Sequence, residues 1–212
     1  MTTQTKKRIG ILVSGGGTNL QALIDAAGRG ELESGTISVV VSSKPGAFAL
    51  ERAKKAGIEG VCVDRKAFSD RATFEEALSG VLRQRDIDVL VLAGFMLVLS
   101  DQFIRQYPDR IVNVHPALIP SFCGDGFYGL HVHERALEYG VKVTGATVHF
   151  VNEVTDGGAI ILQKAVEIPE GIDAEALQQK VMVEAEHILL PQAVELLCAG
   201  RLERVGRRVI IH

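Results

Sequence analysis

The sequence predicts an α/β fold: a Rossmann-like, doubly wound, mostly parallel sheet with an antiparallel extension toward the C-terminus, in a single domain. Two patterns lead to this prediction. Short apolar segments typical of buried strands alternate with amphipathic segments typical of helices through the first half of the chain. In the second half, the strand-like segments 142–151 and 159–168 are separated by only seven residues, which is typical of an antiparallel hairpin. The length of 212 residues suits one sizeable core.

The first half supplies the expected parallel strands. Segment 8–13 is apolar and ends in glycines, and a helical pattern begins at Leu20. Further strands are expected at 37–41, 60–63, 88–92 and 111–115, and further helices at 47–56, 68–85 and 101–106. Because the carboxyl ends of parallel strands meet along one edge of a sheet, we expect segments 15–19, 95–99 and 113–116 to lie on the same rim.

The second half is expected to begin with a long loop at 117–130, and such lengths are typical of lids and binding loops. A helix at 133–139 precedes the hairpin. A long amphipathic helix follows at 174–199, and Pro191 should kink or divide it. A small terminal hairpin is expected around Gly206.

Composition argues against several classes of function. The 23 Lys and Arg against 26 Asp and Glu give a net charge of −3, whereas a nucleic-acid binder usually shows a basic patch. No apolar run approaches the roughly 20 residues that span a bilayer, and the apolar stretch 9–13 is too short for a signal peptide. We therefore expect a cytoplasmic monomer or homodimer with small-molecule substrates and no nucleic-acid or membrane partner. His131 and His133 have no third ligand nearby, so no metal is expected.

The glycine turn at 15–19 predicts a phosphate site. A strand, a glycine turn and a helix N-terminus bring backbone N–H groups together, and the missing Cβ atoms allow close approach. The turn lacks the lysine of a P-loop, and Leu20 stands where a dinucleotide fingerprint needs a small residue. A phosphate monoester therefore fits better than a dinucleotide. The alternative is that the glycines only permit the turn.

Asn113 and His115 are candidates for catalysis. They lie two apart on a predicted strand, so both side chains leave the same face, and Pro116 ends the strand at the rim. An amide can hold an oxyanion, an imidazole can carry a proton, and a carboxylate such as Asp156 can keep that imidazole charged. These three groups are the ones that a one-carbon acyl transfer would need. The alternatives are that His115 is a core histidine and that Asp156 only forms a turn; His149 is expected to be structural.

The chain resembles the phosphoribosylglycinamide formyltransferase family in an ordered set of motifs that spans nearly its whole length. These motifs are Ser14-Gly-Gly-Gly-Thr-Asn-Leu-Gln21, Ala93-Gly-Phe-Met96, Asn113-Val-His-Pro-Ala-Leu-Ile-Pro120, Gly129-Leu-His131, His149-Phe-Val151 and Asp156-Gly-Gly158. The resemblance implies the formyltransferase fold. It also implies transfer of a formyl group from 10-formyltetrahydrofolate to the amine of 5-phosphoribosylglycinamide, the third step of de novo purine (IMP) biosynthesis.

The resemblance implies a role for each matching residue. The catalytic trio would be Asn113, His115 and Asp156. The ribonucleotide would be bound by Gly16, Gly17, Thr18, Asn19 and Glu186, of which Glu186 would hold the ribose hydroxyls; without the resemblance, Glu186 reads as a solvated helix residue. The folate would be bound by Arg71, Met96, Leu97, Val98, Leu99, Asn113, Asn152, Glu153, Val154, Thr155 and Asp156. Residues 1–110 would form the phosphate-binding half of one domain, and residues 111–212 the catalytic and folate-binding half.

The expected mechanism is direct transfer through a tetrahedral oxyanion, in which Asp156 raises the pKa of His115. Leu97 departs from the basic residue usual in the family, and loop 121–128 is longer than in the shortest members and is expected to be a mobile lid. Methionyl-tRNA formyltransferase and formyltetrahydrofolate hydrolase are less expected, because both carry an additional domain. The hydrolase stays an alternative, and so does a non-catalytic phosphate- or nucleotide-binding module.

Overall fold

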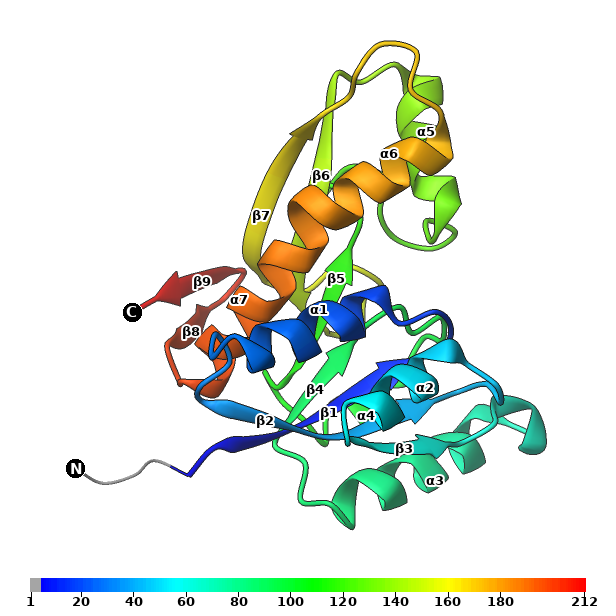
Figure 1. Ribbon diagram of the computed structural model, residues 1–212, viewed down its shortest axis with the longest axis vertical. Coiled ribbons are helices and arrows are strands. Elements are labelled where there is room, and N and C mark those ends of the chain that lie inside the picture. Colours follow the sequence, from blue (N-terminus) through cyan, green and yellow to red (C-terminus); the bar gives the residue numbers. More distant parts are fainter. Residues whose placement is uncertain (1–4) are drawn as a thin grey trace.

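A seven-stranded sheet runs through the molecule in the order β3-β2-β1-β4-β5-β6-β7 (Figure 1). The computed structural model describes residues 5–212. Strands β1 to β5 pair in parallel, and β6 and β7 continue the sheet in antiparallel pairing. The strands are β1 (Lys7–Val13), β2 (Gly35–Ser42), β3 (Glu59–Cys62), β4 (Val89–Leu92), β5 (Ile111–His115), β6 (Val143–Phe150) and β7 (Ile160–Glu167). The predicted fold class is confirmed.

Capping side chains explain where several helices begin. Asp70 accepts a hydrogen bond from the Thr73 N–H, so the third helix starts at Arg71 and not at the predicted position 68. Ser100 and Asp173 cap two further helices in the same way. The helices are α1 (Thr18–Gly28), α2 (Phe48–Lys55), α3 (Arg71–Arg83), α4 (Asp101–Ile104), α5 (Leu130–Tyr139), α6 (Ala174–Val181) and α7 (His187–Cys198), with a 3₁₀ turn at Arg65–Ala67.

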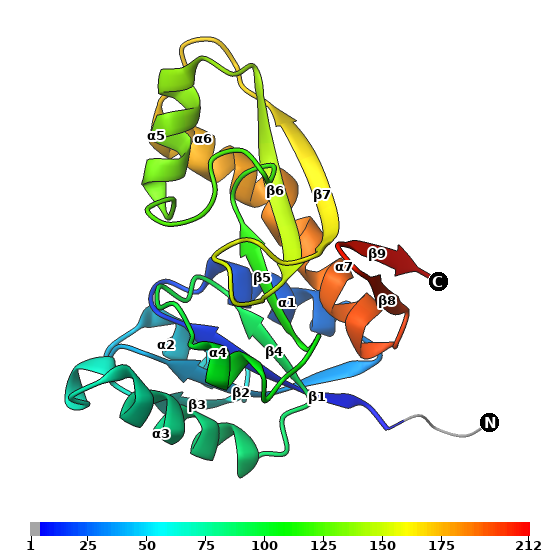
Figure 2. The same cartoon turned by 180° about the vertical axis from the view of Figure 1, so that it is seen from behind.

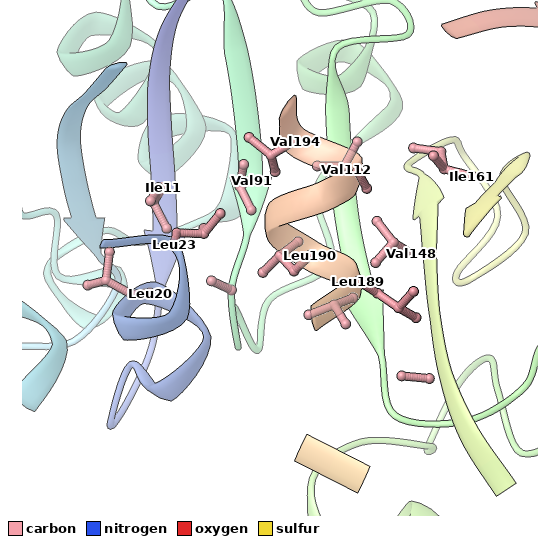
Figure 3. Packing of buried hydrophobic residues seen from close by; sticks show 14 of the residues in the cluster. Ile11, Leu20, Leu23, Val91, Val112, Val148, Ile161, Leu189, Leu190 and Val194 are labelled. Carbon is pink, nitrogen blue, oxygen red and sulfur yellow. The ribbon is translucent and has the colours of Figure 1, made fainter. Parts of the chain in front are cut away.

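The two faces of the sheet carry separate apolar clusters. Alternate residues of β1 point to opposite sides, with Ile11 on one face and Leu12 on the other. Helices α1, α2, α6 and α7 cover the first face, and α3 and α4 cover the second. Figure 3 shows the first cluster, in which Leu23 of α1 and Leu190 of α7 pack against strand residues such as Val91. Each apolar side chain buried in this way stabilises the fold by about 1.5–3 kcal/mol.

The C-terminal helical region is divided, but not at Pro191. Pro191 lies inside α7, and the division is a π-helical turn at Met182–Glu186, where the His187 N–H donates to the Met182 carbonyl. A proline inside a helix clashes with the carbonyl four residues earlier, here that of His187, and the wide turn comes directly before this position. The predicted position of the division is therefore wrong, because the π-helical turn ends five residues before Pro191. The π-helical turn ends at Glu186, a residue with a predicted role.

The strand order brings the predicted site segments together. β1, β4 and β5 are neighbours, so the turns that follow them lie on one rim. The hairpin of β6 and β7 extends beyond the parallel strands, with α5 and α6 beside it (Figure 2), and β6 pairs with β5 so that Asn113 is opposite His149. A second sheet, β8 (Leu202–Val205) with β9 (Arg208–Ile211), is the predicted terminal hairpin. Within residues 5–212, no helix is long and apolar enough to cross a membrane.

Candidate active site

A cavity of about 340 Å³ opens at the carboxyl ends of β4 and β5. It is lined by segments 94–99, 113–115, 124–129 and 151–156, together with Leu92, Ile104 and His149. The cavity contains the three residues of the predicted catalytic trio and, except for Arg71, every residue of the predicted folate set. Arg71 is exposed at the start of α3, outside this lining, and its role stays a prediction. Within the described part of the chain, no group of three or more His, Cys, Asp or Glu could hold a metal ion.

His115 is buried between two acceptors. Its Nε2–H donates to the Phe122 carbonyl oxygen at 2.7 Å, and its Nδ1 lies 3.4 Å from Oδ2 of Asp156. A carbonyl can only accept, so Nε2 carries a proton. In the neutral ring, the Nδ1 lone pair therefore faces the carboxylate, and the ring pairs fully with both neighbours only when it is protonated.

Burial decides the direction in which the pKa of His115 shifts. Loss of solvent lowers this pKa below its ordinary value, while the Asp156 charge and the Phe122 carbonyl oppose the shift and the nearby His149 adds to it. The prediction that Asp156 acts to raise the pKa has the right sign for that one interaction. The net pKa of His115 nevertheless lies below its ordinary value, because removal of the ring from water outweighs the carboxylate.

Asp156 is held from three sides in the turn between β6 and β7. Its Oδ2 accepts from the Gly124 N–H at 2.9 Å, and its Oδ1 lies 3.5 Å from Nε2 of His149. Burial alone would raise the pKa of Asp156, but His149, His115 and Gly124 together lower it below its ordinary value. The backbone of Asp156 has a φ of 54°, a conformation that aspartate tolerates better than most residues. The carboxylate is therefore ionised at neutral pH beside His115.

His149 orients the amide of Asn113, a contact that sequence reasoning missed. The Nδ1–H of His149 donates to the Phe150 carbonyl at 2.9 Å, and Nε2 of the same ring lies 3.3 Å from Nδ2 of Asn113 and 3.5 Å from Oδ1 of Asp156. The second N–H of that amide remains for a group in the cavity. His149 therefore lines the cavity beside Asn113 and Asp156, and its structural role stays a prediction. Its place on the alternating strand 142–151 was visible, but its pairing partner was not.

The loop from β5 to α5 closes one side of the cavity. Phe122 and Gly124 contact His115 and Asp156 as described above, and Oγ1 of Thr155 donates to Oδ1 of Asp125 at 2.8 Å. Phe122 adopts a φ of 48°, which is strained for a bulky residue and is found mostly at functional positions. The predicted loop thus forms a wall of the site, and its motion stays a prediction.

The glycine turn after β1 presents free N–H groups at the start of α1. Gly17 has a φ of 73°, and a Cβ there would lie 2.6 Å from the Ala49 Cβ, so the position needs glycine. Among the described residues, no backbone acceptor outside the regular elements pairs with the N–H groups of Gly16, Gly17 or Thr18. Converging N–H groups at a helix N-terminus suit an anion.

Glu186 links the C-terminal helical region to this turn. Nδ2 of Asn19 donates to Oε2 of Glu186 at 2.7 Å, and both side chains are buried. Burial raises the pKa of Glu186, and the Asn19 bond opposes the rise. The reading of Glu186 as a solvated helix residue is therefore wrong. Oδ1 of Asn19 is buried and has no partner among the described residues, so it could accept from a bound hydroxyl.

Two comparisons with known proteins decide the family. A family model described as formyl transferase matches residues 7–194. The chain is 38% identical over 196 residues to phosphoribosylglycinamide formyltransferase of Haemophilus influenzae. The matched region covers 92% of this chain and 89% of that protein. The chain belongs to the phosphoribosylglycinamide formyltransferase family.

Other relatives of this formyltransferase include a much longer protein and a protein of similar length. It is 44% identical over 97% of its length to the trifunctional purine biosynthetic protein adenosine-3 of Drosophila pseudoobscura, but spans only 15% of that protein. It superimposes on glycinamide ribonucleotide transformylase 1 of Symbiobacterium toebii with a TM-score of 0.91 and 42% identity, covering 97% of this chain and 94% of the other. A formyltetrahydrofolate deformylase of Pseudomonas syringae is more distant, with 25% identity and a TM-score of 0.87, over 98% of this chain and 66% of that one.

Proposed function

We propose that this formyltransferase moves the formyl group of 10-formyltetrahydrofolate onto the amine of glycinamide ribonucleotide in purine biosynthesis. The observation that carries the proposal is the placement of Asn113, His115 and Asp156 in one cavity, on the same rim as the glycine turn after β1, whose N–H groups suit an anion. An acyl transfer to a phosphorylated amine needs both features. The family relationship supports the same reaction.

The ribonucleotide would lie across the turn after β1. The N–H groups of Gly16, Gly17, Thr18 and Asn19 would hold its phosphate, since they converge at the N-terminus of α1. Glu186 and the unpartnered Oδ1 of Asn19 would then accept from the ribose hydroxyls. Residues 1–110 would in this way supply the phosphate site, and residues 111–212 the catalytic trio.

The folate would occupy the cavity, because a mostly apolar pocket with a few polar groups suits a flat heterocycle. Segments 96–99 and 152–156 both line it and would contact the pterin largely through backbone groups. Asn113 and Asp156 belong to both the proposed folate set and the proposed catalytic set, since both line the cavity and would stand where the pterin end meets the reacting carbon.

The trio would act on charge and protons. Asn113 would donate its free N–H to the oxyanion that forms when the amine attacks the formyl carbon, and His115 would add positive charge. Asp156 would hold the His115 ring and stabilise its protonated form. The attacking nitrogen gives up a proton and N10 of the folate gains one as its bond to the formyl carbon breaks, and His115 would carry this proton. No covalent enzyme intermediate is needed.

Hydrolysis of the formyl folate is a second candidate function, favoured by the structural likeness to a deformylase. A formyl-transfer assay followed by absorbance, with and without glycinamide ribonucleotide, separates the two. Transferase activity requires the ribonucleotide, whereas hydrolase activity proceeds without it and releases formate. Saturable ribonucleotide binding with no reaction would instead support a non-catalytic nucleotide-binding module and overturn the proposal.

A further inference from the structure

Helix α2 lies directly against the turn that enters α1. The contact is so close that a Cβ at Gly17 would come within 2.9 Å of the Ala49 Cα. The Ala49 N–H donates to the Gly15 carbonyl at 3.1 Å, and Nε of Arg52 donates to the Gly16 carbonyl at 2.8 Å. Two consecutive carbonyls of the turn are therefore held toward α2, one by backbone and one by a side chain.

These two bonds set the direction of the free N–H groups. In a trans peptide, the carbonyl of one residue and the N–H of the next point in opposite directions. With the Gly15 and Gly16 carbonyls turned toward α2, the N–H groups of Gly16 and Gly17 face away from it. These N–H groups are donors of the proposed phosphate site.

The guanidinium of Arg52 is itself fixed in place. Its Nη1 donates to Oε1 of Gln21 at 3.0 Å, and its centre lies 5.0 Å from the middle of the Phe48 ring. Gln21 in turn donates to Oδ1 of Asp25 at 2.8 Å along α1. The planar fork of arginine suits two acceptors at fixed angles, which a lysine ammonium cannot match.

We propose that Arg52 is a positioning residue of the phosphate site. It holds the peptide between Gly16 and Gly17 in the orientation that presents N–H groups to an anion. It also places a positive charge on the carbonyl side of that peptide. This inference rests on the proposed function, because it concerns how the same site recognises its ribonucleotide. Arg52 does not belong to the residues expected to contact the substrate.

The test compares Arg52→Ala and Arg52→Lys with Lys55→Ala in the full-length enzyme. Lys55 is a suitable control because its ammonium lies 5.9 Å from the same Phe48 ring on the same helix, and no hydrogen bond joins it to the turn. The readouts are the Kd of glycinamide ribonucleotide by calorimetry, the KM of each substrate, and Tm. Losing a hydrogen bond from a charged donor should weaken ribonucleotide binding about tenfold.

The expected result is a ribonucleotide Kd and KM raised about tenfold in Arg52→Ala, with the KM of the formyl folate and Tm unchanged. Arg52→Lys should recover less than half of that loss, and Lys55→Ala should match the wild type. An Arg52→Ala variant that binds like the wild type would overturn the inference, and so would equal increases in both KM values or in the Lys55 variant. If the wild type itself fails to bind the ribonucleotide, the proposed function fails instead.

Discussion

At the scale of single residues, the site depends on how His115 and Asn113 are held by their neighbours. His115 faces a carbonyl on one side and a carboxylate on the other, in a position that is only 4% exposed. Burial favours the neutral ring, and Asp156 favours the charged ring. Small changes in the surroundings of the imidazole can therefore make it take up or release a proton. This balance suits a proton carrier in acyl transfer.

Asp156→Asn tests this balance. Removing the carboxylate charge leaves burial unopposed, so the pKa of His115 should fall further below its ordinary value. The value can be followed by NMR titration of the labelled imidazole. We expect kcat to fall at least about 100-fold, because the protonated ring loses its partner. A His115 pKa that is unchanged or higher in the variant would contradict the geometry described here.

His149→Leu tests the orientation of Asn113. Without Nε2 of His149, the Asn113 amide loses its fixed partner, and kcat should fall about tenfold. The KM of the ribonucleotide should stay close to the wild-type value, since the glycine turn is untouched. His212→Leu, at the exposed end of the chain, is the matched control. Steady-state kinetics that show no loss in His149→Leu would assign this histidine to the core alone.

The sequence predicted some of these residues for physical reasons and missed others. Asn113 and His115 stand out because polar residues two apart on a buried strand must share a face and find partners. Asp156 was a candidate carboxylate, but its contact with His115 could not be predicted, since turn residues carry no spatial signal of their own. His149 was missed because it meets Asn113 across an antiparallel pair, and the register of such a pair depends on the folded sheet.

At the scale of elements, the strands were predictable, whereas the capped start of α3 and the π-helical turn were not. The predicted bounds of every strand of the main sheet agree with the structure to within about two residues, which is the usual uncertainty of such boundaries. These bounds came from the apolar segments and from the glycines and short turns between them. The turn at Met182–Glu186 depends on hydrogen bonds five residues apart, which side-chain periodicity does not reveal. Glu186, the last residue of this turn, is buried against Asn19, where helical periodicity alone predicted a solvated carboxylate.

Gly158→Ala tests the turn that carries Asp156. A Cβ at Gly158 would lie 1.6 Å from the Phe150 carbonyl oxygen, so the turn must move. We expect a loss of about 1–3 kcal/mol in the free energy of unfolding and a clear fall in kcat. Gly80→Ala in α3 is the control, because a Cβ there meets nothing within 4 Å, and it should stabilise the protein by about 0.5–1 kcal/mol. Urea denaturation and kinetics check both variants, and a fully active Gly158→Ala enzyme would contradict the assigned role of the turn.

At the scale of the whole molecule, one polar side chain is expected to make stability depend on pH. His133 of α5 is fully buried, and neither ring nitrogen has a partner among the described residues. Burial, helped by the charge of His115, lowers the pKa of His133 to about 4. The unfolded chain binds this proton at the ordinary pKa of 6.5, so acid favours the unfolded state between these two values.

His133→Phe should remove this sensitivity. Between about pH 7.5 and pH 5, the wild type should lose about 2 kcal/mol more unfolding free energy than the variant, because only its unfolded state takes up the proton. Urea denaturation at both pH values measures the difference. Parallel losses in the two proteins would show that other groups govern stability in acid.

Formyl transfer by this enzyme can be followed at the formyl carbon itself. Wild-type enzyme is mixed with 10-formyltetrahydrofolate labelled with ¹³C at the formyl carbon and with glycinamide ribonucleotide, and the products are read by NMR. We expect the label to appear on the ribonucleotide amine, and we expect His115→Ala and Asp156→Asn to slow its appearance greatly. Label found only in formate, or transfer that is unchanged in both variants, would contradict the proposed function.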